Sequence, residues 1–568
     1  MARSHRWLVA PTLAAGLAAA ALLSGSAETA RSASPAAKPN VVVLMTDDQT
    51  VEELRVMPNV QNLLAAQGVT FDNSFVSYSL CCPSRSTFLT GQYAHNHGVW
   101  GNTAPTGGYY KLDSTNTLPV WLQRAGYQTI HLGKYLNQYG TRSATEIPPG
   151  WGEWQGTPDP STYRYLNYTF NENGKLVTYG NKADMYKTDV EARKAVDIIG
   201  RQQVDPRPFF LWVAFLAPHS GGPRDPDDPA NLATPSPAPR HRNVFANQAL
   251  PIPPSFNEAD VSDKPAGIRN RRLLTTARIN AIRESYQQRA ESLLSVDEAI
   301  GQIVSKLTAI GELDNTYIIF TSDNGFFHGE HRVAAGKVLV YEPSIRVPLI
   351  IRGPGIPRGQ HRRQFVENID LAPTITAVTG AQPGRVMDGR SLIRFAKDPI
   401  YYSGRDLLLE TPTYSGIRTP NWKYVEHTTG ERELYNLARD PYELTSLHAD
   451  LRYTASKDQL AMRLARLRTC AGAACRRGPE LRLGARMERP RNCRRARLRL
   501  AVAGPSSRRI SNTGFYIDGH LLRRDRRAPF TASVPKRFAR PDGSVVSALV
   551  SLTDSRRMTL TRNLAGCR

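Results

Sequence analysis

A short segment around Cys81 holds the side chains best suited to covalent chemistry. Cys81-Cys82-Pro83-Ser84-Arg85 is followed by Thr90-Gly91, which places a thiol two residues before a proline and a cation four positions after the thiol. A buried cysteine usually behaves as a small inert hydrophobic residue, so a vicinal cysteine pair in a turn is the alternative interpretation. Other residues of the chain are needed to distinguish a reactive cysteine from an inert one.

Polar residues follow four predicted strands. Apolar runs at 40–45, 209–216 and 317–321 are typical of strands buried on both faces of a parallel sheet, and Thr129-Ile130-His131-Leu132 is predicted to be a fourth strand. Helical spacing is found at 57–67 and 290–310. In open α/β sheets ligands bind just past the carboxyl ends of the strands. The sequence therefore predicts one site built from the polar residues that follow these strands: Asp47, Asp48, Lys134, His219, Asp323 and Asn324.

The acidic members of this set predict a metal site. Three carboxylates and one amide offer only hard oxygen ligands, which suit Ca²⁺ or Mg²⁺ better than zinc or copper. Without a cation the aspartates would repel one another. Taken singly, Asp47-Asp48 can be a helix cap and Asp323-Asn324-Gly325 a turn. Their shared place at strand ends favours a joint site.

Residues 40–445 resemble the sulfatases of the alkaline phosphatase superfamily, and are most similar to N-acetylglucosamine-6-sulfatases and related glycosaminoglycan sulfatases. Besides the Cys81 segment and 94–99, the resemblance rests on several motifs in the same order along the chain. They are Gly133-Lys134-Tyr135-Leu136-Asn137-Gln138-Tyr139-Gly140, Gly311-Glu312-Leu313-Asp314-Asn315-Thr316-Tyr317, Val347 to Gly355, Asp370-Leu371-Ala372-Pro373-Thr374, Glu433 to Leu437 and Asp440 to Leu444.

The resemblance implies the fold. We expect an α/β fold with a large central, mostly parallel sheet flanked by helices, as in alkaline phosphatase, followed by a smaller α+β C-terminal subdomain. A small basic all-β domain forms the tail. The expected limits are a catalytic domain at 39–398, a C-terminal subdomain at 399–468, a linker at 469–489 and an immunoglobulin-like β domain at 490–568. The Pro-rich stretch 221–275 is expected to be a long loop beside the site.

The resemblance also implies the chemistry of residue 81. A maturation enzyme converts the first cysteine of the motif to formylglycine, and Cys82 stays a thiol. The aldehyde hydrates to a geminal diol, one hydroxyl attacks the sulfur of a sulfate monoester, and the second expels sulfate as the aldehyde forms again. Residue 81 also completes the metal shell. The implied ligands of Ca²⁺, preferred to Mg²⁺, are Asp47, Asp48, Cys81, Asp323 and Asn324.

Four cationic or basic side chains match the family's remaining catalytic positions. Arg85 is expected to hold the hydrated aldehyde, and Asp323 to accept its proton. His219 and Lys337 are candidates to protonate the leaving oxygen, with Lys134 stabilising charge on the sulfuryl group. A solvated surface lysine is the alternative for Lys337. Many sulfatases have a histidine at the position of Leu136. The glucosamine-6-sulfatase branch, like this chain, lacks that histidine.

The implied function is hydrolysis of sulfate monoesters, of sulfated sugars such as 6-sulfated N-acetylglucosamine or of aryl sulfates. A phosphate or phosphonate monoester hydrolase of the same superfamily is one alternative. A catalytically silent protein that binds acidic glycans is the other, and it requires Cys81 to remain a thiol.

The N-terminus predicts export. A basic start at Arg3 to Arg6, an apolar run from Trp7 to Leu23 and small residues up to Ala27 are typical of a secretory signal peptide at 1–27. A small, polar segment at 28–38 reads as a linker. The apolar run is shorter than the ~20 residues that a spanning helix needs. We therefore expect a secreted, extracellular protein.

Charge and cysteines set the tail apart. Residues 461–568 hold 26 Lys and Arg against 6 Asp and Glu, whereas residues 1–460 hold 47 against 44. Such a basic module suits sulfated or otherwise acidic polysaccharides, and no aromatic-interleaved motif for specific nucleic acid binding is present. A plain soluble spacer is the alternative. Four tail cysteines permit three disulfide pairings, of which we favour Cys470–Cys475 and Cys493–Cys567.

Overall fold

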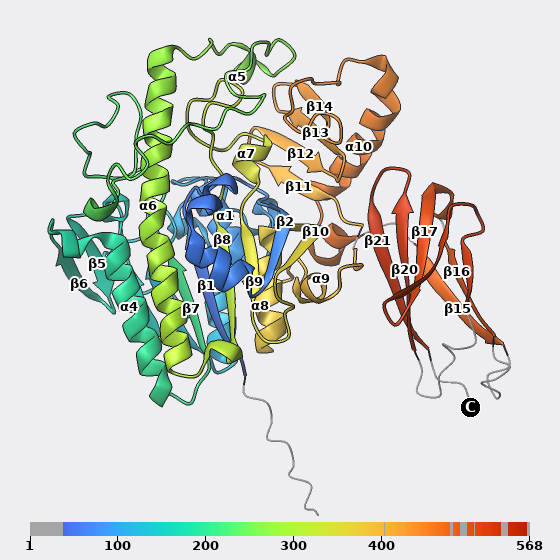
Figure 1. Ribbon diagram of the computed structural model, residues 1–568, viewed down its shortest axis with the longest axis horizontal. Coiled ribbons are helices and arrows are strands. Elements are labelled where there is room, and N and C mark those ends of the chain that lie inside the picture. The colour runs from blue at the N-terminus through green and yellow to red at the C-terminus, as the bar shows by residue number, and fades with distance from the viewer. Residues whose placement is uncertain are drawn as a thin grey trace, which may run out of the picture. The chain divides into compact units, whose positions relative to one another are not determined.

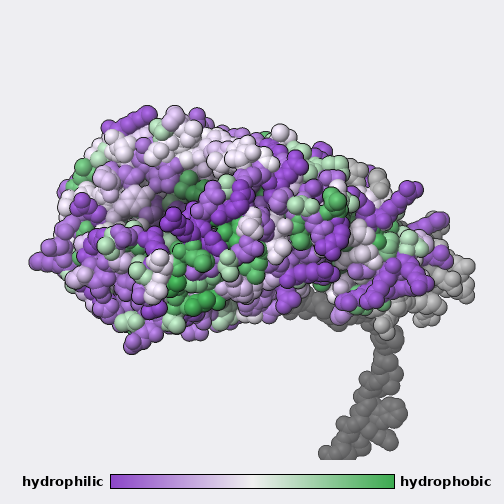
Figure 2. Space-filling view, turned by 90° about the horizontal axis from the view of Figure 1, so that it is seen from above, coloured by the Kyte–Doolittle hydropathy of each residue, from purple (hydrophilic) through white to green (hydrophobic). Residues whose placement is uncertain are grey.

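The computed structural model describes residues 38–402, 404–477, 481–488, 497–504, 506–534 and 544–564. The predicted signal peptide, all but the last residue of the predicted linker at 28–38, and the predicted Cys493–Cys567 pair lie outside these ranges. Within them, no helix is both long and apolar enough to cross a membrane. Hydrophilic residues cover most of the face shown in Figure 2.

A 10-stranded sheet forms the centre of the described catalytic region, in the order β10-β2-β9-β8-β1-β7-β3-β4-β5-β6 (Figure 1). Its central strands β8, β1, β7, β3 and β4 are parallel, as are β10 and β2, whereas β9, β5 and β6 are antiparallel to their neighbours. The predicted mostly parallel sheet is confirmed. The strands are β1 (Asn40–Thr46), β2 (Val69–Phe75), β3 (Gln128–Gly133), β4 (Glu153–Gly156), β5 (Tyr168–Glu172), β6 (Lys175–Tyr179), β7 (Phe209–Ala214), β8 (Thr316–Ser322), β9 (Leu349–Arg352) and β10 (Gln360–Glu367).

The central strands are apolar along their whole length because both faces of the sheet are covered. Every residue of β1, β7 and β8 is buried. Successive strand residues point to opposite faces. Val41 and Val43 accordingly join one hydrophobic core, and Val42 and Leu44 join the other.

Helices form a layer on each face of the sheet (Figure 1). The core that contains Val42 is completed by α4 and α6, and the core that contains Val41 is completed by α1, α3 and α8. The helices of the catalytic region are α1 (Cys81–Thr90), α2 (Ala94–His97), α3 (Leu118–Arg124), α4 (Lys187–Arg201), α5 (Ala266–Arg269), α6 (Thr276–Ala309), α7 (Glu342–Ile345), α8 (Leu371–Thr379) and α9 (Ile393–Lys397).

Two helices differ from their predicted limits. The helix predicted at 290–310 is the second half of α6, which starts 14 residues earlier at Thr276. Thr275 caps this start, since its side chain accepts a hydrogen bond from the Arg278 amide. The helix predicted at 57–67 is shorter and is a π-helix at Val60–Ala65. Its first amides are fixed by the Asp297 carboxylate of α6, at 2.9 Å from the amides of both Asn59 and Val60.

The C-terminal subdomain is a four-stranded antiparallel sheet with one helix, as predicted. It consists of β11 (Leu407–Glu410), β12 (Tyr414–Arg418), β13 (Trp422–His427), β14 (Arg432–Asn436) and α10 (Thr454–Leu467). Leu460 and Leu464 of α10 pack on Ile417 and Leu434 of the sheet. After α10, Cys470 and Cys475 form a disulfide, which confirms that predicted pair.

The tail is an all-antiparallel β module with two sheets, ordered β15-β16-β19 and β18-β17-β20-β21 among the described strands. Both sheets contribute to one core, which includes Leu500, Phe515 and Val550. The module begins at Arg482, inside the stretch 469–489 predicted as a linker. Its strands are β15 (Arg482–Glu488), β16 (Arg497–Ala503), β17 (Ile510–Ile517), β18 (His520–Asp525), β19 (Thr531–Val534), β20 (Ser544–Leu552) and β21 (Arg557–Leu564).

Candidate active site

The carboxyl ends of neighbouring strands bring the predicted polar residues together. Thr46 at the end of β1 pairs with Ser322 at the end of β8, so Asp47 and Asp323 follow side by side. Gly133 at the end of β3 pairs with Ala214 of β7, which places the start of the Lys134 segment on the other side. The strand arrangement thus explains why residues almost 300 positions apart share one site.

Cys81 starts α1 and points its thiol at this group. Leu80 before it is extended, and all ten residues of α1 are buried. The Cys81 Sγ lies 2.9 Å from Lys337 Nζ, 3.5 Å from Asp47 Oδ1 and 3.6 Å from Lys134 Nζ. The residue singled out by the motif and those singled out by the strand ends therefore belong to one cluster.

The acidic residues form a connected, fully buried group. The Asp48 amide donates to Asp323 Oδ1 at 3.1 Å, and Asn324 Nδ2 donates to Asp48 Oδ1 at 2.7 Å. One potential ligand atom from each of Asp47, Asp48, Cys81 and His219 lies within 4.8 Å of the others. His219, which the predicted ligand set did not include, is part of this group.

The donor set fits a hard divalent cation. The carboxylates of Asp47, Asp48 and Asp323 are at most 2% exposed, and their oxygens are the ligands that Ca²⁺ and Mg²⁺ prefer. Asn324 Oδ1 is buried and has no hydrogen-bond partner among the described residues. Because an unpaired buried carbonyl oxygen is costly, this atom is a free ligand position for a cation.

Three cations hold the carboxylates in place. Arg85 Nε donates to Asp323 Oδ2 at 2.8 Å, and its Nη2 lies 3.3 Å from Asp47 Oδ2. Lys134 forms an ion pair with Asp47, and Lys337 forms one with Asp48. Both partners of the Arg85 pairs are fully buried, so removal of either would leave an uncompensated buried charge.

The balance of nearby charges and burial lowers the pKa values of Asp47 and Asp48 and raises the pKa of Cys81. Burial alone would raise the pKa of Asp47, but Lys134 and the other nearby cations bring it below its usual value. Lys337 does the same to the pKa of Asp48, again against the effect of burial. Burial raises the pKa of the Cys81 thiol to about 12, and Asp47 adds to the increase. An unmodified Cys81 is therefore a protonated thiol near neutral pH and a poor nucleophile.

His219 is the most accessible basic group of the cluster, with 18% of its side chain exposed. Its Nδ1 lies 2.7 Å from the Ser220 carbonyl, which can only accept, so Nδ1 carries a proton. Its Nε2 faces Asp48 Oδ2 at 3.8 Å. Burial lowers the pKa of His219, although Asp47 and Asp48 oppose this change. The loop that follows, 221–275, contains only α5 and one short 3-10 turn among its regular elements.

Three further residues that support the cluster were not predicted. Arg289 of α6 donates from Nη2 to the Asp48 carbonyl at 2.6 Å and is itself paired with Glu53 at 2.7 Å. The Tyr163 ring lies 5.1 Å from the His219 ring, and Lys134 Nζ is 4.9 Å from its centre. Arg289 lies in an amphipathic helix, and Glu53 and Tyr163 lie in short 3-10 helices, where no sequence spacing distinguishes them.

Comparison with known proteins identifies sulfatases as relatives of this chain. The Sulfatase family model matches residues 39–381, and the model "N-sulphoglucosamine sulphohydrolase, C-terminal" matches residues 329–470. An arylsulfatase from Volvox carteri is 35% identical over 494 residues, covering 77% of this chain and 76% of the relative. The N-acetylglucosamine-6-sulfatase of Homo sapiens is 32% identical over 492 residues, covering 77% and 86%.

A solved structure agrees with the sequence comparisons. It is a complex of a protein with its substrate, D-glucosamine-2-N,6-O-disulfate. Its TM-score is 0.63 at 25% sequence identity, and the match covers 75% of this chain and 97% of the other. The family model spans more than half of the chain and contains every residue of the cluster around Cys81. This chain belongs to the sulfatase family.

Proposed function

We propose that this protein hydrolyses sulfate monoesters of sugars at the cluster around Cys81. The observation that carries the proposal is the position of Cys81 at the start of a buried helix, with two lysines and a carboxylate within 3.6 Å of its sulfur. A nucleophile at this position would act beside cations that can stabilise charge on sulfuryl oxygens. Hydrolysis of an ester needs both features.

The proposed substrate class is a sulfated amino sugar, such as 6-sulfated N-acetylglucosamine. Two similarities support it. The human relative is an N-acetylglucosamine-6-sulfatase, and the protein in the similar complex binds a glucosamine that carries 2-N and 6-O sulfates. Aryl sulfates are a second class, because the Volvox carteri relative is an arylsulfatase.

Residue 81 acts as formylglycine in this proposal, made from Cys81 by a maturation enzyme. The formylglycine hydrate supplies an oxygen nucleophile and a second hydroxyl whose deprotonation releases sulfate. Arg85 holds the modified residue from one side, since its guanidinium is fixed between Asp323 and Asp47. Asp323 is in position to accept a proton from that residue through the same hydrogen-bonded group.

The remaining basic groups surround the reacting ester. Lys134 and Lys337 both contact the sulfur atom of Cys81, so they reach whatever is bound at residue 81. We assign them to the sulfuryl oxygens and to the leaving oxygen, respectively. His219 reaches the leaving side as well, with Nε2 directed at the cluster and Nδ1 held by the Ser220 carbonyl.

A divalent cation, Ca²⁺ in preference to Mg²⁺, belongs to the proposed site. Asp47, Asp48, Asp323 and Asn324 would hold it together with residue 81, and it would add positive charge beside the sulfuryl group. Chelation with EGTA is expected to abolish turnover, with recovery on adding Ca²⁺ and less recovery on adding Mg²⁺. Full activity after chelation and gel filtration would contradict the assignment.

The protein is proposed to act outside the cell. Its N-terminal 27 residues have the layout of a signal peptide, and the Cys470–Cys475 disulfide is typical of an oxidising compartment. The arginine-rich tail is proposed to contact acidic polysaccharides. N-terminal sequencing of the protein from the culture medium of its host is expected to begin after Ala27.

Mass spectrometry of the peptide with residue 81, after alkylation of free thiols, tests the mechanism. An aldehyde at position 81 beside an alkylated Cys82 is the expected result for protein from the native host. Two alkylated thiols would contradict the mechanism and favour a silent glycan-binding protein. Turnover of paired sulfate and phosphate esters with the same leaving group tests the reaction. We expect the sulfate ester to be preferred, and a preference for phosphate would contradict the proposal.

A further inference from the structure

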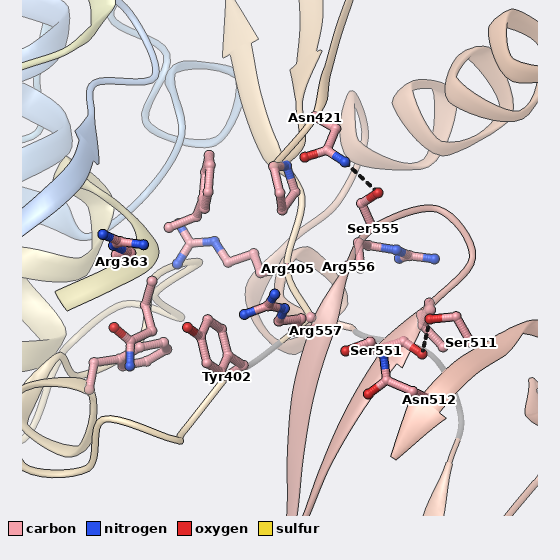
Figure 3. A pocket seen from close by; sticks show the side chains of 16 residues that line it. Arg363, Tyr402, Arg405, Asn421, Ser511, Asn512, Ser551, Ser555, Arg556 and Arg557 are labelled. Atoms are coloured by element: carbon pink, nitrogen blue, oxygen red, sulfur yellow. Dashed lines mark hydrogen bonds between the residues drawn. The ribbon is translucent and has the colours of Figure 1, made fainter. Parts of the chain in front are cut away.

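A cavity of about 420 Å³ lies away from the Cys81 cluster, where the β module meets the catalytic region. One wall comes from β10, from the segment between α9 and β11 and from the turn before β13. The other comes from β17 and from the turn between β20 and β21 (Figure 3). The cavity is within the usual size range of small-molecule sites, which is about 300–1,000 Å³.

A buried ionic network fixes these two walls against each other. Arg463 of α10 binds Asp406 at 2.9 Å through Nε and lies 3.6 Å from Asp554 of the module. Arg556 of the module binds Asp554 at 2.9 Å and lies 3.6 Å from Asp406. The Tyr402 amide also donates to Thr559 Oγ1 at 2.8 Å. All four charged side chains of the network are at most 9% exposed.

The lining of the cavity is cationic. It includes four arginines and no acidic residue: Arg363, Arg405, Arg556 and Arg557. Arg405 is paired behind the wall with Asp370 and Glu367, and Arg556 is paired within the network. For Arg363 and Arg557, the described part of the chain offers no carboxylate within 4.0 Å. Two guanidinium charges at this cavity are therefore free to meet an anion.

One buried donor in the lining also lacks a partner. Arg405 is 5% exposed, and its Nε has no hydrogen-bond partner among the described residues although its two other nitrogens are used. A buried N–H without an acceptor costs about 1–3 kcal/mol, so an acceptor atom at this point would be favourable. An oxygen of a bound anion would supply it.

The neutral lining residues suit a sugar. Asn421 reaches into the cavity and bonds Ser555 Oγ, and Asn512 and Ser551 face it from the module (Figure 3). Amides and hydroxyls of this kind exchange hydrogen bonds with sugar hydroxyls. Tyr402 adds an aromatic surface, with the Arg557 guanidinium 5.7 Å from its ring centre.

We propose that this cavity, which shares no lining residue with the Cys81 cluster, is a non-catalytic binding site for a sulfated sugar unit of a polysaccharide. Arg363 and Arg557 would bind the sulfate group, and Asn421 and Tyr402 would contact the ring. A chain held here by one unit would have its other units at raised local concentration near the protein. The choice of a sulfated sugar rests on the proposed function, but binding here requires no turnover.

The test uses the full chain with Cys81→Ala, which prevents turnover, and a heparin-type sulfated tetrasaccharide as the probe. Isothermal titration is expected to resolve a class of sites that Arg363→Gln and Arg557→Gln each weaken roughly tenfold, the worth of one charge-assisted contact. Arg524→Gln is the matched control, since Arg524 is an exposed arginine of β18 outside the cavity. It is expected to change the affinity less than twofold.

A second measurement does not depend on how the variants fold. Arg363 and Arg557 are exposed, so phenylglyoxal can modify them in the unaltered protein, and peptide mass spectrometry can quantify the modification. The tetrasaccharide is expected to protect both arginines at least fivefold and to leave Arg524 unprotected, with protection lost as salt is raised.

Three outcomes would overturn the proposal. The first is unchanged modification of Arg363 and Arg557 with the tetrasaccharide bound. The second is equal protection by inorganic sulfate at the same concentration, which would show an anion site without sugar recognition. The third is equal protection by the desulfated tetrasaccharide. None of them touches the ester hydrolysis proposed at Cys81, which is measured separately with a small aryl sulfate.

Discussion

The catalytic region and the β module differ in how they place their charges. Around Cys81, carboxylates and cations face each other at buried strand ends, and nearly every charge has a partner at hydrogen-bond distance. In the module, arginines far outnumber acids, and strands such as β18 expose them to solvent at Arg523 and Arg524. The module's paired charges, Arg556 and Asp554, lie at the join with the catalytic region.

This difference shows that the free-energy cost of a charge depends on whether it is buried or exposed. A buried charge must be matched by its neighbours, so each change in the catalytic cluster should affect both folding and chemistry. An exposed arginine is solvated and contributes little to stability, so it is free to serve binding. Substitutions in the two regions should therefore have effects of very different size.

The largest effect is expected from Cys81→Ala. This change removes the proposed nucleophile while keeping a small apolar side chain at the start of α1, so turnover of an aryl sulfate should fall at least ~10⁴-fold. Cys82→Ala is the matched control, because Cys82 is an equally buried thiol beside it. Steady-state kinetics measures turnover by both variants, and thermal unfolding tests whether both are folded. Retained activity in Cys81→Ala would remove the cluster from the mechanism.

Lys337→Met should have the next largest effect. The change keeps the length of the side chain but removes the charge that contacts both Asp48 and the Cys81 sulfur, so kcat should drop roughly 10²–10³-fold. The control is Lys397→Met, at an exposed lysine of α9. A loss confined to KM would assign Lys337 to substrate binding instead.

Glu191 of α4 breaks the rule of paired charge in the catalytic region. It is 1% exposed, both its carboxyl oxygens lack a hydrogen-bond partner among the described residues, and burial raises its pKa to about 8, against a partial offset by Lys187. Between pH 4.5 and pH 8 the unfolded chain loses this proton while the folded chain keeps it. Stability contributed by Glu191 is thus complete below pH 4.5 and is lost as pH rises through 8.

Glu191→Gln, which mimics the protonated acid, should remove this loss and raise stability at pH 8 by about 4 kcal/mol. Thermal unfolding at pH 5 and pH 8 measures it, with the exposed Asp197→Asn of the same helix as control. Parallel pH profiles for Glu191→Gln and the unaltered protein would show that Glu191 is ionised in the folded state.

The smallest effect is expected in the module. Arg523→Gln, on exposed β18, should change the free energy of unfolding by less than about 0.5 kcal/mol. Arg556→Gln, which removes one of the two arginines that neutralise the buried Asp554 and Asp406, should cost several times more. Chemical denaturation of the two variants compares them directly. Equal losses would mean that exposure does not separate the two kinds of arginine.

Much of the site could be predicted because the buried strands of a parallel sheet are recognisable in the sequence. The apolar runs that became β1, β7 and β8 show no alternation of polar and apolar residues. The polar residues just after these strands and after β3 lie at one edge of the sheet because the strands are parallel. The supporting residues could not be found in this way. Arg289 lies on a long amphipathic helix that carries many charged residues, and only the fold decides which of them, such as Arg289, Glu291 and Asp297, are buried.

The boundaries were harder for a similar reason. In β15 the apolar Leu483, Ala485 and Met487 alternate with Arg482, Gly484, Arg486 and Glu488, but the charged residues hide this short pattern, so the stretch was predicted as a linker. The start of α6 depends on the Thr275 cap, and the π-helix after β1 depends on a carboxylate of α6 far along the chain. Thr275 is a local cap that the helical spacing at 290–310 does not reveal, whereas Asp297 lies 238 positions from Asn59 and is absent from the local sequence.

The burial of α1 sets an order of events in the life of the protein. Every residue of α1 is buried, and Arg85 at its centre is 0% exposed between its two carboxylates. An enzyme that reads Cys81 to Arg85 as a peptide cannot reach these side chains once the helix has packed. The proposed oxidation of Cys81 would then have to come before folding is complete, and a chain that folded first would keep its thiol.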